Sequence, residues 1–408
     1  MTTNFWTTPE LKQIHIELTN ACNAACPMCV RFYHNSPLPR PDLEVGQITL
    51  DKFKQYFPPE ILQPCAKIMF CGVHGDPCMA RDMLEICEYI QEHTTMKFAV
   101  QVHTNGGMRN PEWWAELGRV FAKRNQMTWE CWRVIFSVDG LEDTNHIYRR
   151  NVKWNNLIAN IKAFIGAGGN AGWEYLIFKH NEHQLEEAEA LSKELGFKLF
   201  IPKKALGVAH DNMLQPMSAL SKEGKLEYVI EAPTKAEYRN VANPEGTSAP
   251  PKLEFKIEDY RKLKEIKSNE NYKDRVDRVY DVIATQDLTK LDSCEIKCKA
   301  SKDWGAKEVF VDNFGRVIPC CYIGTHLNGT NTNINTLQLH KAMNDYGWDN
   351  FDLNKHSLKE ILDAGHLDRV FADTWSKGSI KEGKMGYCAS ICGEESRVDR
   401  VYFQKYGP

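Results

Sequence analysis

Short apolar, β-branched runs recur along the first half of the chain, and helical patterns separate them. Six runs predict strands, at residues 13–18 (QIHIEL), 67–70, 98–103, 133–138, 173–178 and 198–201. Apolar residues at helical spacing predict helices over 82–93, after 110 and over 181–195. Asn110-Pro111 is typical of a helix start, and Gly196 of a helix end. This alternation predicts an α/β fold of parallel β/α units, as an open sheet or a partial barrel.

The loops after these predicted strands carry residues suited to ligand binding. They contain a cysteine triplet at 22–29, CGVHGDP at 71–77, TNGG at 104–107, SVDG at 137–140 and KHN at 179–181. Turn chemistry alone would explain any one of these loops. The carboxyl ends of parallel strands meet at one edge of a sheet, however, and ligands bind there. We therefore expect one functional rim that includes the cysteines.

Composition narrows the class of protein. The chain has 408 residues, enough for two or three domains, with 42% hydrophobic and 26% charged residues and a net charge of -3. There is no strongly basic field to indicate nucleic-acid binding. The first residues, MTTNFWTTPELKQ, have neither the cationic nor the apolar part of a signal peptide, so we expect a cytoplasmic protein. Fourteen cysteines in a reducing compartment call for an explanation other than disulfides.

The cysteine triplet Cys22, Cys26 and Cys29 has C-x3-C-x2-C spacing. A structural zinc site needs a fourth ligand, for which His34 is a poor candidate, and an all-thiolate catalytic zinc with an open position is unusual. The third interpretation is a [4Fe-4S] cluster with one iron left open. Such clusters normally take four thiolates, so three would leave a place for a small molecule.

The motif CNAACPMC, the GDP at 75–77, TNG, and SVDG followed by Arg149 resemble the radical S-adenosylmethionine (SAM) superfamily. The resemblance covers about residues 11 to 200. It implies a partial (β/α)6 TIM-like barrel, whose cluster binds SAM at the open iron. One-electron reduction then yields a 5'-deoxyadenosyl radical that abstracts a substrate hydrogen. The resemblance also implies an electron donor such as flavodoxin or ferredoxin.

The same resemblance implies roles for individual residues. Gly75, Asp76 and Pro77 would line the edge that receives the SAM amino group, Ser137 and Arg149 would approach its carboxylate, and Lys179 and Asn181 would lie near ribose. Thr104, Asn105 and Asp139 complete the expected cofactor-binding set. Two positions depart from the family pattern. Met28 stands where an aromatic residue near adenine is usual, and Asp76 replaces the commoner glutamate.

Six further cysteines lie near the C-terminus. Cys294 with Cys298 and Cys388 with Cys392 form two spaced pairs, and Cys320 and Cys321 end the predicted hairpin between them: EVFVD, a turn at 313–315, and RVIPC. This arrangement resembles the SPASM and twitch extensions of radical SAM enzymes. It implies one fully ligated auxiliary [4Fe-4S] cluster held by Cys298, Cys320, Cys388 and Cys392, with Cys294 and Cys321 as alternative ligands. A four-thiolate structural zinc site is the competing interpretation.

We expect three parts of the chain: a radical SAM partial barrel over 1–204, an insertion or linker over 205–290, and a small cysteine-rich SPASM/twitch-like domain over 291–408. The insertion contains VANPEGTSAPP and a highly charged helical stretch at 256–281. It is either a solvated surface segment or, over 205–255, a lid on the barrel mouth.

The leading functional hypothesis is a radical SAM oxidoreductase that oxidises or cross-links its substrate with help from the auxiliary cluster. The substrate is a peptide or a small molecule. The barrel begins within about fifteen residues of the N-terminus, which leaves no room there for a leader-binding domain and disfavours the peptide. Two alternatives are a redox-neutral rearrangement or cyclisation of a small molecule, and a non-catalytic zinc-binding scaffold.

Overall fold

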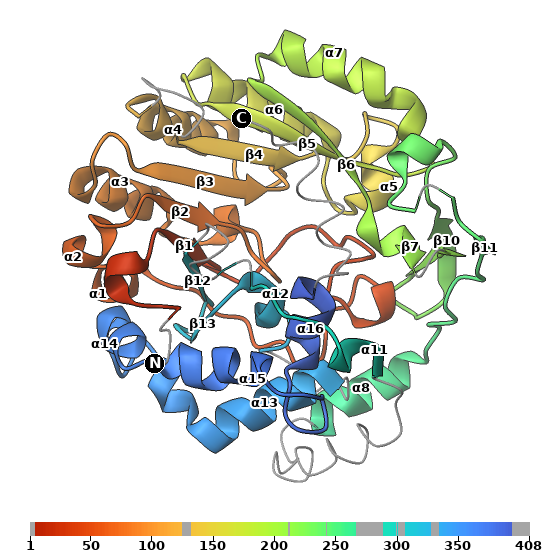
Figure 1. Cartoon of the computed structure of the whole chain (residues 1–408). Helices are drawn as coiled ribbons and strands as arrows, with labels where there is room; N and C mark the ends of the chain where they lie inside the picture. The colour runs from red at the N-terminus through yellow and green to blue at the C-terminus, as the bar shows by residue number, and fades with distance from the viewer. Residues whose placement is uncertain are drawn as a thin grey trace.

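A single large sheet forms the centre of the computed structural model, which describes residues 5–124, 132–210, 213–241, 243–266, 289–298, 300, 307–327 and 334–393. The sheet has eight strands in the order β13-β12-β1-β2-β3-β4-β5-β6 (Figure 1). Their bounds are β1 Gln13–Ile16, β2 Lys67–Phe70, β3 Ala99–Thr104, β4 Arg133–Ser137, β5 Ala171–Ile177, β6 Leu199–Lys204, β12 Glu308–Val311 and β13 Val317–Ile318. Neighbouring strands pair in parallel throughout, except β12 with β13.

The six strands predicted from the sequence are β1 to β6, within a few residues at each end. They lie in the sheet in sequence order, so the predicted α/β fold of parallel β/α units is confirmed. This arrangement is consistent with a partial TIM-like barrel, in which each crossover helix returns the chain to the next parallel strand. All the predicted rim loops therefore leave from the same edge of the sheet.

Helices connect the strands along one side of the sheet (Figure 1). They are α1 Leu50–Tyr56, α2 Pro59–Leu62, α3 Met83–His93, α4 Pro111–Ala122, α5 Asn145–Tyr148, α6 Trp154–Gly166 and α7 Leu185–Leu195. The predicted start of α4 is confirmed, because the Asn110 side chain accepts from the amide of Trp113 at 3.0 Å. The predicted end of α7 is confirmed by Gly196, whose φ of 90° is the left-handed conformation that glycine tolerates.

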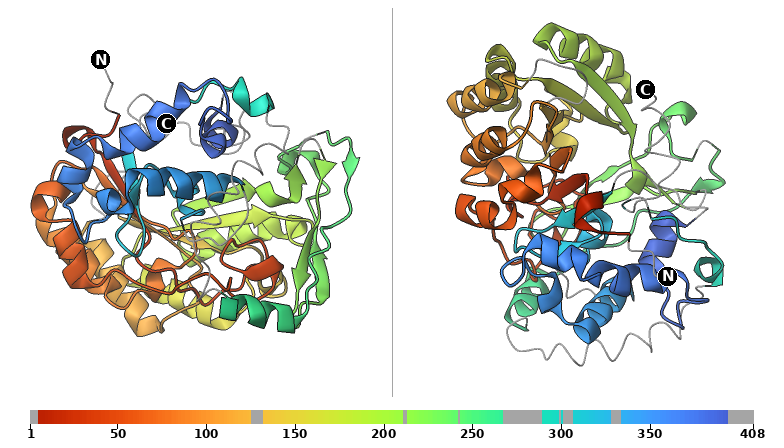
Figure 2. Two further views of the ribbon diagram at one scale, coloured as in Figure 1. Left: turned by 90° about the horizontal axis from the view of Figure 1, so that it is seen from below. Right: turned by 60° about the vertical axis from the view of Figure 1, so that its left-hand side comes forward.

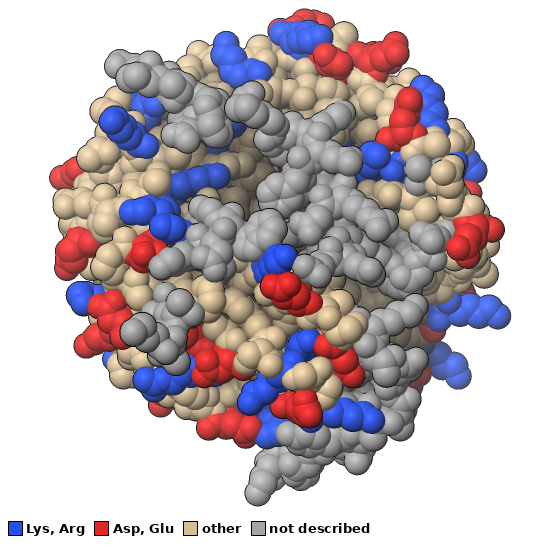
Figure 3. All heavy atoms as spheres, viewed as in Figure 1, with Lys and Arg blue, Asp and Glu red and all other residues tan. Residues whose placement is uncertain are grey.

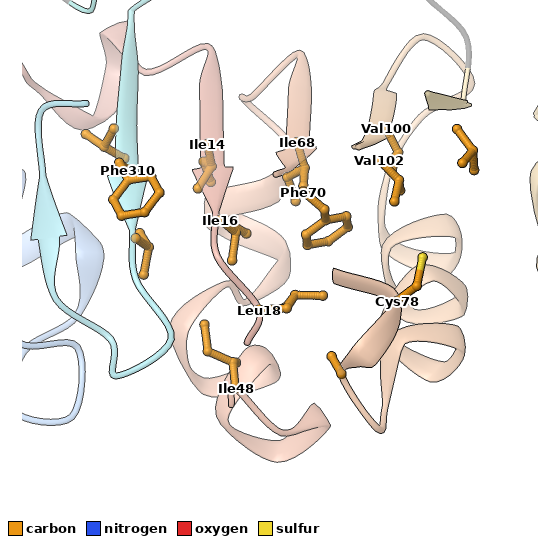
Figure 4. Close-up of a cluster of buried hydrophobic side chains, with 14 of the residues drawn as sticks. Ile14, Ile16, Leu18, Ile48, Ile68, Phe70, Cys78, Val100, Val102 and Phe310 are labelled. Atoms are coloured by element: carbon orange, nitrogen blue, oxygen red, sulfur yellow. The ribbon is translucent and has the colours of Figure 1, made fainter. Parts of the chain in front are cut away.

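The two faces of the sheet differ in composition because side chains alternate along each strand. Ile14, Ile16, Phe70, Val100 and Val102 lie on the face that the helices cover, and each is fully buried (Figure 4). On the same side Trp114 of α4 packs against Phe136 of β4, with ring centroids 5.2 Å apart. The opposite, concave face carries half-buried polar residues, which are described with the site below.

The C-terminal hairpin extends the barrel sheet. β12 pairs in parallel with β1, with Gln13 opposite Glu308 and Ile16 opposite Val311. The predicted turn is confirmed at Gly315, whose φ is 90°. The hairpin is therefore part of the central sheet, although it falls in the part of the chain expected to form the cysteine-rich domain.

The insertion forms small sheets beside the open end of the strands. Its strands are β7 Ala209–His210, β8 Met213–Leu214, β9 Met217–Leu220, β10 Leu226–Ile230 and β11 Gly246–Thr247. β9 pairs with β10, and β8 pairs with both β7 and β11. Helix α8 spans Ile257–Ile266 and agrees with the start of the predicted charged helix, whose remainder lies outside the described residues.

The last part of the chain is helical and lies along the β13 side of the sheet (Figure 1). Its helices are α11 Thr289–Asp292, α12 Cys321–Gly324, α13 Ile334–Tyr346, α14 Leu358–Asp363, α15 Asp373–Trp375 and α16 Gly386–Cys392. The N-terminal segment lies against these helices (Figure 2). The amide of Phe5 donates to Asp368, and the ring of Phe5 lies 5.3 Å from that of Trp375.

Candidate functional site

The cysteine triplet lies in the loop that follows β1, as predicted. Cys26 is buried, and Cys22 and Cys29 are half-buried. The thiols lie close enough to interact electrostatically, Cys22 with both Cys26 and Cys29. Burial raises the pKa of all three thiols, that of Cys29 to about 11. Because metal ligation requires thiolates, an iron-sulfur cluster bound here would displace these protons.

Two side chains from other loops of the rim direct N–H groups at the cysteine sulfurs. Asn105, after β3, donates to Cys22 Sγ at 3.7 Å, and Arg149, after α5, donates to Cys26 Sγ at 3.8 Å. Such hydrogen bonds favour thiolates and tune the potential of a cluster. Three thiols and two donors are a set that fits a [4Fe-4S] cluster with one iron open.

Asp76 is held at the centre of a hydrogen-bond network between the loops after β2 and β3. Its carboxylate accepts from the amide of Cys78 at 3.0 Å, the hydroxyl of Thr104 at 2.9 Å and the amide of Asn105 at 2.8 Å. The side-chain amide of Asn105 donates to it as well, at 2.7 Å. Burial raises the pKa of Asp76 while these donors oppose the rise. The predicted residues Asp76, Thr104 and Asn105 are thus brought together, and Asp76 is N-cap of the short turn that starts at Pro77.

At Gly75 the backbone of the loop after β2 lies against the backbone of the loop after β1. A Cβ atom at this position would lie 1.9 Å from the carbonyl oxygen of Thr19. The carboxylate of Glu17 holds the same loop, because it accepts from the amides of His74 at 2.6 Å and Gly75 at 3.1 Å. Sequence reasoning missed Glu17. The sequence feature that could have identified Glu17 is an acidic residue directly after the last residue of a buried strand.

Arg149 links the fourth loop to the cysteines. Its Nε donates to Oδ2 of the fully buried Asp139 at 2.5 Å, and Asp139 also accepts from the amide of Leu176 at 2.7 Å. Burial by itself would lower the pKa of Arg149, but Asp139 and Cys26 hold it well above its usual value. The predicted partner Ser137 is the last residue of β4 and lies half-buried opposite Glu174 of β5.

The two residues predicted to contact ribose, Asn181 and Lys179, bond to the loops after β4 and β5 and to the insertion. Asn181 is fully buried, where its amide donates to the carbonyls of Asp139 and Leu176, both at 2.9 Å. Its Oδ1 accepts from the amide of Phe178 at 2.7 Å, so the side chain shapes the loop after β5. Lys179 is half-exposed and pairs with Glu231 of the insertion at 2.8 Å. The ribose contacts of these two residues stay predictions.

The four cysteines assigned to the auxiliary cluster lie together. Cys298 interacts electrostatically with Cys320, Cys388 and Cys392. All four line one small cavity of about 20 Å³, together with apolar and aromatic residues. Cys321 does not line this cavity, and its thiol interacts electrostatically with Cys320, Glu308 and Cys71. This donor set fits a fully ligated cluster.

Among the described residues, no group of three or more His, Cys, Asp or Glu side chains is arranged to hold a single metal ion. The helices of those residues include none with the length and apolar character needed to cross a membrane.

The concave face of the sheet carries polar side chains that sequence reasoning did not single out as a group. Gln101 and His103 of β3 are half-buried there, with Gln101 Nε2 2.8 Å from His103 Nε2. Glu174 of β5 forms an ion pair with Lys203 of β6. The sequence does indicate a polar face of the sheet. The strands FAVQVH and WEYLIF alternate apolar and polar residues, whereas a wholly buried parallel strand would be apolar throughout.

A cavity of about 1090 Å³ lies beside the rim, between the barrel and the insertion. Its walls include His146 and Arg150 after β4, His180 after β5, and Glu227 and Tyr228 of β10. Arg150 donates to the carbonyl of Leu220 at 2.9 Å, and Tyr228 donates to that of Ile147 at 2.7 Å. The β9–β10 hairpin is therefore anchored on the loops that follow the strands.

With this geometry in place, we compared the chain with known proteins. No family model matches it, and no curated protein matches it. Solved structures similar in fold include Streptococcus suis SuiB bound to S-adenosylmethionine, at 12% identity over 79% of this chain and 62% of SuiB, with a TM-score of 0.42. SuiB bound to its precursor peptide SuiA has 12% identity over 94% and 72%, with a TM-score of 0.47. The structure of anSMEcpe with bound AdoMet has 14% identity over 91% of this chain and 88% of that chain, with a TM-score of 0.44.

The chain is similar in fold to these structures of SuiB and anSMEcpe with S-adenosylmethionine bound. It spans 62% of the length of SuiB in the SAM-bound structure. At these identities the likeness concerns the fold alone.

Proposed function

We propose that this chain is a radical SAM enzyme whose [4Fe-4S] cluster is held by Cys22, Cys26 and Cys29. The observation that carries the proposal is the triplet on the rim, with Asn105 and Arg149 donating to its sulfurs. When bound, the reduced cluster supplies one electron that breaks the S–C5' bond of SAM, giving methionine and a 5'-deoxyadenosyl radical, which takes a hydrogen atom from a substrate C–H bond.

The protein's own residues position SAM and keep water away. The Arg149 guanidinium, fixed by buried Asp139, is the charge partner for the SAM carboxylate, with Ser137 beside it. The backbone from Gly75 to Pro77, fixed by the Asp76 network and Glu17, faces the SAM amino group. The apolar core beneath the rim excludes water from the reacting atoms.

The auxiliary cysteines Cys298, Cys320, Cys388 and Cys392 would hold a second [4Fe-4S] cluster, and their clustering in one cavity supports this assignment. An oxidation or a cross-link requires the substrate radical to lose one electron and one proton, and a cluster held by these four cysteines would supply the acceptor for that electron. Reduced flavodoxin or ferredoxin in the cytoplasm would donate the first electron. We further propose that the hairpin of residues 217–230 covers the barrel mouth, since Tyr228 and Arg150 anchor it there.

The substrate is a peptide or a small molecule. SuiB and anSMEcpe were solved with peptides bound, the SuiA precursor and Cp18Cys. Redox-neutral rearrangement or cyclisation of a small molecule is the second candidate. It requires an open iron in the auxiliary cluster, whereas four clustered cysteines favour full ligation.

Iron analysis and SAM cleavage test the proposal. Anaerobically purified protein should contain about eight irons per chain, the number in two cubane clusters, and no zinc. With dithionite it should convert SAM to 5'-deoxyadenosine and methionine. Alanine at Cys22, Cys26 or Cys29 should abolish that conversion, with alanine at the buried core residue Cys87 as the matched control. Zinc in place of iron, or persistent 5'-deoxyadenosine formation in the C26A variant, would refute the assignment.

A further inference from the structure

The concave face of the sheet has a polar centre next to the proposed SAM site. Ser137 pairs in register with Glu174, and Glu174 forms an ion pair with Lys203 on the last strand of the sheet. The side chains of Lys203 and Glu174 are 22% and 15% exposed, so both reach the space above the sheet. On the opposite face of the same strand, Trp173 and Tyr175 are fully buried. The pair is therefore not needed to fill the core.

His103 lies across from this ion pair on β3. Its Nε2 faces the side-chain nitrogen of Gln101 at 2.8 Å, and an amide nitrogen is a donor. Nε2 is therefore the acceptor, and the proton of the neutral ring is on Nδ1. Among the described residues Nδ1–H has no hydrogen-bond partner, which leaves one donor available to a ligand. Burial lowers the pKa of His103 to about 4, so the ring is neutral at pH 7.

Two ammonium groups and one carboxylate act on the His103 ring. After burial, the largest influence on its pKa is the Glu174 carboxylate, and the ammonium groups of Lys203 and Lys67 act in the opposite sense. Burial opposes the charge of Glu174, while Lys203 and Arg149 stabilise it. An ammonium group has three donors on a flexible stem, so Lys203 can contact a ligand as well as Glu174. Figure 3 shows a shaded hollow in the upper half of the viewed face, with Lys or Arg side chains (blue) beside it.

We propose that the concave face between His103 and Lys203 binds an anionic oxygen group of the substrate, a carboxylate or a phosphate. Lys203 pairs with the anion, and His103 donates to it from Nδ1. Glu174 holds Lys203 in place and limits the affinity by competing for its ammonium group. This inference rests on the proposed function, because it names the substrate class of that reaction, but anion binding itself requires no radical chemistry.

The test is direct titration of anaerobically purified, SAM-saturated protein with two probes, succinate for the carboxylate and inorganic phosphate for the phosphate, by isothermal titration calorimetry. At least one probe should bind the native protein. K203Q should weaken that binding about tenfold, the effect of losing one charge-assisted hydrogen bond. E174Q should strengthen it about threefold, since a competing carboxylate is removed. H103Q should weaken it less than K203Q does, because a neutral donor is lost.

Lys193 provides the matched control. It pairs with Glu189 on the exposed side of α7, and K193Q should leave binding unchanged. A native protein that binds neither probe would overturn the proposal. Equal effects of K203Q and K193Q, or weaker binding in E174Q, would also overturn it, the last because the pair would then be structural. SAM cleavage is measured separately, so failure of the anion site and failure of the radical SAM assignment are distinguishable.

Discussion

The guanidinium of Arg149 contacts the sulfur of Cys26, with Nη1 3.8 Å from Sγ, although the two residues are 123 positions apart in the chain. The same guanidinium donates from Nε to Asp139, whose side chain is fully buried. One side chain therefore joins the cysteine loop to the fourth strand. The first prediction concerns the ion pair of Arg149 with Asp139.

Replacing Arg149 by glutamine should destabilise the fold by about 3 kcal/mol, because it leaves the buried charge of Asp139 without its partner. Urea unfolding measures the loss. The R149Q/D139N double variant should recover much of it, since no unpaired charge then remains. The control is R119Q, whose exposed pair with Glu116 should change stability by less than about 0.5 kcal/mol. Equal stabilities of R149Q and R119Q would show that the Arg149 pair contributes nothing.

Gly75 should not tolerate even a methyl group. G75A places a Cβ 1.9 Å from the Thr19 carbonyl, so the loops after β1 and β2 must separate, at a cost of about 2 to 4 kcal/mol. G166A is the matched control, because a Cβ there meets nothing within 4 Å. At the end of α6 alanine should stabilise by about 0.5 kcal/mol through its higher helix propensity. Thermal unfolding of both variants checks the prediction, and an unchanged G75A would contradict the close approach.

The carboxyl of Glu308 should make stability fall as pH rises from 4.5 to about 7. Burial raises its pKa from 4.5 to about 7, although Lys67 and Gln13 oppose the rise. Between these two values the folded state holds a proton that the unfolded state has lost, so the contribution is complete below pH 4.5 and is lost as pH rises toward 7. Because Glu308 is half-buried, we expect a change of about 1 to 2 kcal/mol.

Urea unfolding of E308Q and native protein at several pH values isolates this effect. The difference between them should change between pH 4.5 and 7 and be constant above it. A difference that does not vary with pH would show that the folded and unfolded states bind the proton of Glu308 equally.

Replacing Cys320 should lower the iron content of the protein, and replacing the adjacent Cys321 should not. Cys320 lines one cavity with the three other cysteines of the auxiliary set, whereas Cys321 does not line it. If the auxiliary cluster is present, C320S should reduce the iron content from about eight to about four per chain, and C321S should leave it at about eight. Iron and sulfide analysis after anaerobic purification measures both. The reverse result would exchange the roles of the two residues.

Much of the fold could be predicted because the signals are local. Asn110-Pro111 and Gly196 mark helix ends through the bonds they make within a few residues, and β1 to β6 each carry their own apolar pattern. The place of β12 could not be predicted, since EVFV has no feature that names β1 as its neighbour.

The candidate site was predictable to a similar extent. Cys22, Asp76 and Arg149 follow separate strands, and parallel topology brings them to one rim. The partners that define their roles were not predictable. Lys179 pairs with Glu231 and Glu17 holds the His74 amide, and both contacts join segments whose separation in sequence gives no sign of their contact in space.

The pairing of β12 with β1 has a consequence for how the protein is made. The side chain of Gln13 contacts that of Glu308 across 295 residues, so during synthesis β1 leaves the ribosome long before its neighbour exists. Until then the first strand is an open edge able to pair with another nascent chain. Expression of a fragment that ends before residue 307 should therefore give aggregates, however complete its proposed SAM site is.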